Sequence, residues 1–282
     1  MPSAIYCPVC GDRRDFIQVF VRDAFPIARC SACGVGMTQL PADFSAAGIY
    51  DESYFQGGQA DGYSDYVGSE DVLRGEFHAA LEALRKAGCS GGKLLELGCA
   101  YGFFLAEARA HFEVEGIEMC ESAVRFCRTR GLDVEQGALT AEYVDSRGPF
   151  DAVVMLDVVE HLMDPDRAME LVHKAMKPGG KLMLTTGDWE SGLSRIMGRH
   201  WRLMTPPQHT FFFSPRTMSA MLARVGFDVV ECSKPWKKVP LGLTIYQLGR
   251  ILGMSRPPRL SGIHLGIPIN LFDAFRVVAI RR

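Results

Sequence analysis

The chain has 282 residues, of which 48% are hydrophobic and 23% are charged, and its formal net charge is -2. This composition is typical of a packed globular protein with one α/β domain and a small additional unit, and it excludes a largely disordered chain. The near-neutral charge and the lack of an 18-residue apolar run argue against a general nucleic-acid or membrane partner and against a membrane span.

The N-terminus lacks the basic, apolar and small-residue order of a signal peptide, so we predict a cytoplasmic protein.

Two cysteine pairs dominate the first 40 residues. Cys7 and Cys10 form one C-x2-C pair, Cys30 and Cys33 form the other, and 19 residues separate the pairs. Such spacing is typical of a ribbon in which four thiolates bind one Zn²⁺ and leave no open coordination position. We therefore predict a structural zinc ribbon over residues 1–40.

Residues 41–90 are predicted to connect this ribbon to a larger domain. Their first part is rich in Gly, Asp, Ser and Tyr, which is typical of a linker that packs on another part of the chain. From Asp71 to Ala87 the apolar residues recur at helical spacing, which predicts a lead-in helix. The glycines that follow it end the helix.

Residues 91–282 alternate between short apolar runs and helical segments. Strands are predicted at 93–97, 113–117, 134–135, 151–156, 181–186, 227–231 and 275–280, and helices at 103–111, 122–130, 167–176 and 215–225. Uninterrupted apolar runs such as VVML indicate strands that are buried on both faces. The alternation predicts an α/β fold, a Rossmann-like seven-stranded, mostly parallel sheet with helices on both faces. Before the last strand, residues 236–271 are predicted to form a helical insertion, with the helix at 241–252.

A glycine turn follows the first strand of this domain, in the sequence LLELGCAYGFF. Gly98 permits a tight bend after Glu96, and Gly102 is expected to let the backbone approach a ligand closely. Glu118 ends the next strand, about 20 residues later, at the spacing from which a carboxylate accepts both hydroxyls of a ribose. The pattern is not GxGxxG and no Lys-Ser/Thr follows it, which disfavours a nicotinamide dinucleotide site and a P-loop.

Taken together, these motifs resemble the class I S-adenosylmethionine-dependent methyltransferases over residues 94–231. The resemblance implies S-adenosylmethionine as the cofactor, with its methionine part over the glycine turn, its ribose on Glu118, and its adenine between Met119 and Ala138. A ribbon followed by a Tyr-rich segment further resembles a subgroup that modifies small molecules, sugars or natural products. In that subgroup Tyr54 would fold over the pocket, although it can equally be an ordinary packing residue. The residues implied to contact the cofactor are Tyr54, Glu96, Gly98, Cys99, Gly102, Phe103, Glu118, Met119, Ala138 and Asp157.

His161 and His209 are the candidate catalytic residues. The segment Asp157-Val-Val-Glu160-His161 follows the fourth strand and allows three interpretations. It can be structural, it can bind a divalent metal through three ligands on one helical face, as a similar segment in the ubiquinone-type O-methyltransferases is thought to do, or His161 can act as a general base. His209 precedes the aromatic run at 211–213, which either lines an acceptor pocket or anchors the loop to the core.

The predicted function is methyl transfer to a small-molecule acceptor, through O- or C-methylation. One alternative is an RNA or protein methyltransferase targeted by the ribbon, and another is a non-catalytic cofactor-binding protein. The four arginines of the ribbon are offset by three aspartates, which makes a poor phosphate-binding surface. No NPPY-type tetrapeptide follows the fourth strand, which argues against methylation of a base amino group.

Overall fold

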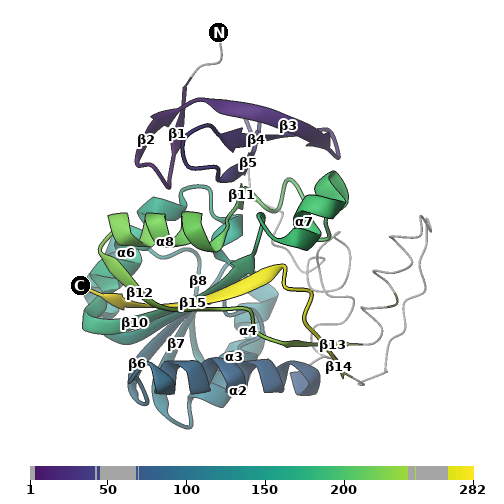
Figure 1. The fold of residues 1–282 in the computed structure, drawn as a ribbon. Coiled ribbons are helices and arrows are strands. Elements are labelled where there is room, and N and C mark those ends of the chain that lie inside the picture. The colour runs from purple at the N-terminus through teal and green to yellow at the C-terminus, as the bar shows by residue number, and fades with distance from the viewer. Residues whose placement is uncertain (1–3, 42, 45–67, 69, 241–244, 246–265) are drawn as a thin grey trace.

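A seven-stranded sheet forms the centre of the computed structural model, which describes residues 4–41, 43–44, 68, 70–240, 245 and 266–282 (Figure 1). Its strand order is β12-β15-β10-β9-β6-β7-β8. The strands are β6 (Gly92–Leu97), β7 (Phe112–Glu118), β8 (Asp133–Gln136), β9 (Phe150–Leu156), β10 (Met176–Gly187), β12 (Phe227–Ser233) and β15 (Ala274–Arg281). Only β15 runs antiparallel to its neighbours β10 and β12. The prediction of a mostly parallel, Rossmann-like α/β sheet is therefore confirmed.

Helices cover both faces of this sheet because successive strand residues point to opposite sides. On β9, Val153 belongs to the core with α5 (Ala141–Arg147), α6 (Pro165–Ala175) and α8 (Pro215–Arg224). Its neighbour Val154 belongs to the opposite core, with α2 (Glu70–Lys86), α3 (Phe103–Ala108) and α4 (Glu121–Thr129). Figure 1 shows α6 and α8 above the sheet and α2 and α3 below it.

Most of the predicted elements lie within a few residues of their observed bounds, and two differ for local reasons. The helix after the glycine turn ends at Ala108, three residues earlier than predicted. Strand β10 begins at Met176, five residues before the predicted start at 181, and the register to β9 shifts between Met176 and Lys181. Helix α5 was not predicted, although Thr140 caps its N-terminus by accepting a hydrogen bond from the Tyr143 amide.

The N-terminal ribbon contains five strands, none of which was predicted. They are β1 (Ile5–Cys7), β2 (Asp12–Arg14), β3 (Phe16–Arg22), β4 (Phe25–Cys30) and β5 (Gly36–Thr38). A four-stranded sheet of order β11-β5-β4-β3 joins the ribbon to β11 (Phe211–Phe212), which comes from the larger domain. Val9, Phe16 and Val35 pack in the same core as α6 and α8. The ribbon is thus built into the fold by both a strand pairing and a shared core.

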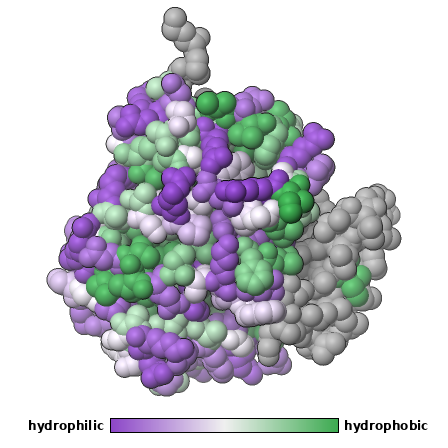
Figure 2. All heavy atoms as spheres, viewed as in Figure 1, coloured by the Kyte–Doolittle hydropathy of each residue, from purple (hydrophilic) through white to green (hydrophobic). Residues whose placement is uncertain are grey.

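The segment before the last strand begins and ends in strands, where a helical insertion was predicted. Strands β13 (Lys237–Pro240) and β14 (Gly266–Ile269) pair antiparallel. The predicted helix at 241–252 lies, apart from Ile245, outside the described residues, as do Tyr54 and most of the linker. Within the described parts of the chain, no helix is long and apolar enough to cross a membrane. On the face seen in Figure 2, hydrophilic and hydrophobic residues are interspersed.

Candidate functional site

A pocket of about 450 Å³ lies at the carboxyl ends of β6, β7, β9 and β10. This is the edge at which open α/β sheets bind their ligands, and the volume is within the range of small-molecule sites. The predicted residues on its wall are Gly98, Glu118, Met119, Ala138, Asp157 and His161. Glu96, Cys99, Gly102, Phe103 and His209 do not line it.

Glu118 is held rigidly at the end of β7. Its Oε2 accepts a hydrogen bond of 2.9 Å from the amide of Ala100, and its Oε1 accepts one of 2.8 Å from the amide of Cys120. Burial raises the pKa of the Glu118 carboxyl, and the backbone hydrogen bonds partly offset that effect. Both oxygens retain acceptor capacity, so the carboxylate can receive two hydroxyl groups at once.

The glycine turn places backbone directly against the pocket. Gly98 has φ +69°, and a Cβ added there would lie 2.6 Å from the Val158 side chain. Ala100 has φ +48°, an unusual conformation for a residue with a side chain, and its amide donates a hydrogen bond to Glu118. Gly102 differs from the prediction, because a Cβ there would meet Leu132 and Cys127 and not the pocket. Glycine is favoured at this position by its φ of +71° and by the close approach of Leu132 and Cys127.

Glu96 lies behind the pocket in the buried part of β6. The residue is 3% exposed, and its Oε2 has no hydrogen-bond partner among the described residues. Burial raises the pKa of the Glu96 carboxyl well above its ordinary value. A buried carboxyl of this kind is protonated in the folded chain over part of the pH range in which the unfolded chain is ionised.

We expect the free energy of unfolding of Glu96→Gln, minus that of the unmodified protein, to increase as pH rises from 5 to 7. Above the unfolded pKa of about 4.3, the unfolded chain releases a proton that the folded chain keeps, so stability falls by up to about 1.4 kcal/mol per pH unit. Glutamine removes this linkage and leaves all other groups in place. Urea unfolding of both proteins at pH 5, 6 and 7 measures the difference, and equal differences at all three values would contradict the expectation.

Asp157 follows β9 in a left-handed conformation, with φ +55°. Its amide donates to Thr185 Oγ1 over 3.0 Å, and its Oδ1 accepts from the same hydroxyl over 2.8 Å. The residue therefore precedes the short 3-10 helix Val159–His161 and does not share a helical face with it. At this position the potential metal-ligand atoms that lie within 4.8 Å of one another belong to Glu160, His161 and His209, and Asp157 is not among them. The structure does not form the three-ligand helical face that the metal interpretation requires.

His161 lines the pocket, and its ring orientation is fixed by the backbone. Its Nδ1 lies 3.0 Å from the carbonyl oxygen of Gln208. Because a carbonyl can only accept, Nδ1 carries the hydrogen and Nε2 is the basic nitrogen of the neutral ring. Burial lowers the pKa of His161, an effect that the Gln208 carbonyl partly opposes. A neutral, oriented imidazole on the pocket wall is the arrangement that a general base requires.

His209 lies behind His161. Their ring centroids are 4.7 Å apart in an edge-on arrangement, and burial lowers the pKa of His209 well below its ordinary value. The aromatic run at 211–213 is buried, and Phe211 and Phe212 pair with β5 of the ribbon. None of these phenylalanines lines the pocket, so the run anchors the segment.

The four cysteines of the ribbon lie together. Cys7 Sγ is 3.6 Å from Cys33 Sγ, and Cys10 Sγ is 3.9 Å from Cys30 Sγ. All four sulfurs lie within 4.8 Å of one another. Four thiolates about 2.3 Å from a tetrahedral Zn²⁺ have sulfurs roughly 3.8 Å apart, so the donor set and its spacing fit zinc.

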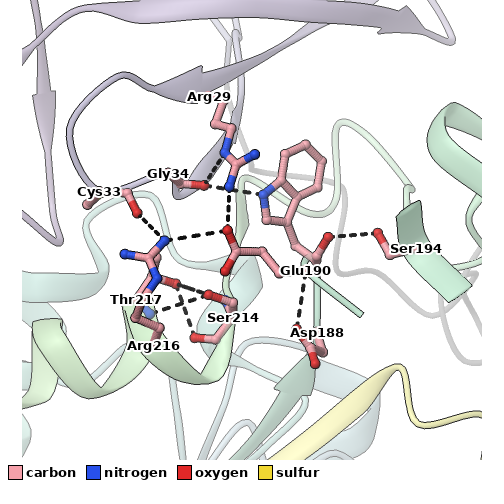
Figure 3. A network of polar contacts seen from close by, with 10 residues as sticks. Arg29, Cys33, Gly34, Asp188, Glu190, Ser194, Ser214, Arg216 and Thr217 are labelled. Carbon is pink, nitrogen blue, oxygen red and sulfur yellow. Dashed lines mark hydrogen bonds and ion pairs between the residues drawn. The ribbon is translucent and has the colours of Figure 1, made fainter. Parts of the chain in front are cut away.

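The second cysteine pair is also docked onto the larger domain, as Figure 3 shows. Glu190 forms ion pairs with Arg29 of the ribbon and Arg216 of α8. Arg216 donates over 2.7 Å to the carbonyl of Cys33, and Trp189 Nε1 donates over 3.3 Å to that of Gly34. The backbone at Cys33 and Gly34 is therefore held by Arg216 of α8 and by Trp189, which follows β10.

Several wall residues were missed by sequence reasoning. Phe77 of α2, Thr185 of β10, Trp236 and Arg276 of β15 also border the pocket. Thr185 had a usable signal, because it lies near the carboxyl end of a predicted parallel strand. The others come from elements that are far apart in the sequence, so no local pattern marks them.

Comparison with known proteins agrees with this geometry. The methyltransferase domain family matches residues 71–232, which is more than half of the chain. The ubiquinone biosynthesis O-methyltransferase of Pseudomonas aeruginosa is 32% identical over 160 residues, covering 52% of this chain and 68% of that protein. The same-named enzyme of Cupriavidus pinatubonensis is 27% identical over 207 residues, with 68% and 76% covered.

Solved structures show the same fold. The YcgJ protein of Bacillus subtilis has a TM-score of 0.53 at 16% identity, covering 73% of this chain and 99% of that one. The pocket at the strand ends, the buried Glu118 carboxylate and the family match lead to one conclusion: the chain belongs to the methyltransferase domain family and is a class I S-adenosylmethionine-dependent methyltransferase.

Proposed function

We propose that this chain methylates a hydroxyl group of a small-molecule acceptor. The observation that carries the proposal is His161, a neutral imidazole on the pocket wall whose Nδ1–H is committed to Gln208. Relatives named as O-methyltransferases support the choice of a hydroxyl. The largely apolar wall supports a small organic acceptor over a polyanion.

The cofactor is proposed to lie between the glycine turn and Glu118. The Glu118 carboxylate would accept both ribose hydroxyls, while Met119 and Ala138 flank the adenine. Gly98 and Ala100 would present backbone to the methionine part, with Asp157 beside them. The sulfonium of S-adenosylmethionine makes its methyl group electrophilic, so the protein mainly aligns the acceptor and excludes water.

His161 is proposed to take the proton of the acceptor hydroxyl. The acceptor oxygen would form a bond to the methyl carbon while the S–CH3 bond breaks, and S-adenosylhomocysteine would leave as a neutral thioether. The proton of the hydroxyl would pass to His161 Nε2, so that the positive charge of the sulfonium ends on the imidazolium. Gln208 keeps the ring oriented while this occurs. His209 is proposed to support His161 from behind and not to touch the acceptor.

Labelled S-adenosylmethionine tests this proposal. The purified protein is incubated with a panel of a phenol, a catechol, a deoxysugar and an aliphatic alcohol, with a thiol and an amine of matched size, and with RNA. We expect label on one class of hydroxyl compound. Label on the amine alone, or on RNA alone, would contradict the proposal.

The ribbon is proposed to bind one structural Zn²⁺ through Cys7, Cys10, Cys30 and Cys33, within a unit of residues 1–40 that residues 41–90 connect to a methyltransferase domain of residues 91–282. A methyltransferase domain preceded by such a ribbon is typical of the subgroup that the sequence resembles. Three of its four arginines already pair with carboxylates, which supports a structural role over one in phosphate binding.

We expect one zinc ion per chain by elemental analysis, and less than a tenth of that in Cys30→Ser, because a structural site loses its metal when one thiolate is removed. Cys232→Ser is the matched control, since that thiol is exposed and lies outside the ribbon. Equal zinc in Cys30→Ser and in the control would contradict the assignment.

A further inference from the structure

A series of hydrogen bonds through Thr38, Thr210 and Gln208, here called the clasp, connects the ribbon to His161. It begins at Thr38, the last residue of β5, which is 3% exposed. The Thr38 hydroxyl donates a hydrogen bond of 2.6 Å to the carbonyl of His209, and the Thr38 amide donates one of 2.9 Å to the carbonyl of Thr210. One buried threonine of the ribbon thus holds two consecutive peptide groups of the larger domain.

The next contacts lead from this segment to the 3-10 helix that carries His161. The Thr210 amide donates over 2.8 Å to the carbonyl of Glu160. The Thr210 hydroxyl lies 2.7 Å from the carbonyl of Leu162 and 3.0 Å from that of Glu160. The residues before and after His161 are therefore both held by Thr210.

The same segment also holds the His161 ring. Gln208, which precedes the clasped residues, supplies the carbonyl that accepts from His161 Nδ1 over 3.0 Å. The position of this carbonyl depends on the path of residues 208–210, and that path is held in turn by Thr38. A displacement of the clasp would loosen both the helix and the hydrogen bond that selects the tautomer.

We propose that Thr38 is a positioning residue for His161, so that the ribbon orients the imidazole of the active site. The inference rests on the proposed role of His161 as a base. It assigns the ribbon a part in the reaction that needs no contact with the acceptor. The link crosses 171 residues of sequence, so it exists only in the folded chain.

The test is the tautomer of His161, read from the ring nitrogen signals in ¹⁵N-histidine-labelled protein. His161→Asn assigns the signals by their loss from a protein with seven histidines. Thr38→Val removes the hydroxyl at nearly constant volume, and Thr38→Ser retains it. Tyr6→Phe is the matched control, because the Tyr6 hydroxyl also links the ribbon to the domain, through Asp166 of α6, by a contact that does not lead to His161.

We expect a single Nδ1–H tautomer in the unmodified protein, in Thr38→Ser and in Tyr6→Phe, and a mixture of tautomers in Thr38→Val. With an acceptor from the panel, Thr38→Val should lower kcat about tenfold and leave the KM for S-adenosylmethionine unchanged. An unchanged Nδ1–H tautomer in a folded Thr38→Val protein, or an equal change in Tyr6→Phe, would overturn the proposal. If Thr38→Val does not fold, Thr210→Val breaks the next link and is judged by the same outcomes.

The same spectra separate this inference from the proposed function. An Nε2–H tautomer in the unmodified protein would contradict His161 as the base. An Nδ1–H tautomer that is unchanged by Thr38→Val would contradict only the positioning role.

Discussion

Glu118→Ala is expected to weaken the binding of S-adenosylhomocysteine by at least about 100-fold. A hydrogen bond to a charged group contributes roughly 1.5–3 kcal/mol, and the carboxylate is proposed to accept two from the ribose. The side chain is 7% exposed and accepts hydrogen bonds from two backbone amides, so the carboxylate is already oriented before a ligand binds. Isothermal titration calorimetry with S-adenosylhomocysteine measures the change directly.

Glu121→Ala is the control for this experiment. Glu121 begins the helix after Glu118, is exposed, and pairs only with Arg125 in its own helix among the described residues. Its removal should change the affinity less than twofold. Because loss of Glu118 leaves two amides without an acceptor, circular dichroism and a thermal melt must show that the variant is folded. A folded Glu118→Ala that binds as tightly as the control would contradict the cofactor site.

His161→Asn is expected to slow methyl transfer by about 10²- to 10⁴-fold, the range that a positioned general base contributes. The asparagine amide can still donate to the Gln208 carbonyl, so the local backbone should be retained while the basic nitrogen is lost. Affinity for S-adenosylhomocysteine should stay within about threefold, since this residue is not proposed to hold the nucleoside. Single-turnover rates with the acceptor found in the panel provide the measurement.

His173→Asn is the matched control, because burial also lowers the pKa of His173 but the ring packs on Phe227 and does not line the pocket. Only neutral His161 can act as a base, and burial lowers its pKa, so the rate should fall to half its maximum only below about pH 6.5, the ordinary pKa of histidine. A rate that is already halved above pH 7, or a fully active His161→Asn, would rule out His161 as the base.

The sheet was predictable because each of its strands carries its own local signal. VVML in β9 is an uninterrupted apolar run, and β6 is largely apolar and ends just before Gly98. Short runs of this kind that end at turn residues are typical of buried parallel strands. Glu118 could be placed for the same reason, since its spacing from the glycine turn is a property of one β-α-β unit.

The clasp around His161 could not be predicted in this way. Thr38 and Thr210 are ordinary threonines in the sequence, and they act together only because β5 and β11 pair. The phenylalanines of β11 left two interpretations open, since a buried aromatic anchor and an apolar pocket wall require the same residue types. Glu96 and Gly102 were predicted to contact the cofactor, but Glu96 is buried in β6 and a Cβ at Gly102 would meet Leu132 and Cys127, so neither residue lies on the pocket wall.

The most direct test of the cofactor site is a crystal structure of the protein with S-adenosylhomocysteine. We predict both ribose hydroxyls within about 3 Å of the Glu118 carboxylate, the distance of an ordinary hydrogen bond, and a sulfur atom on the side of the pocket that His161 lines. A ligand bound elsewhere on the chain, or one whose ribose faces away from Glu118, would contradict it.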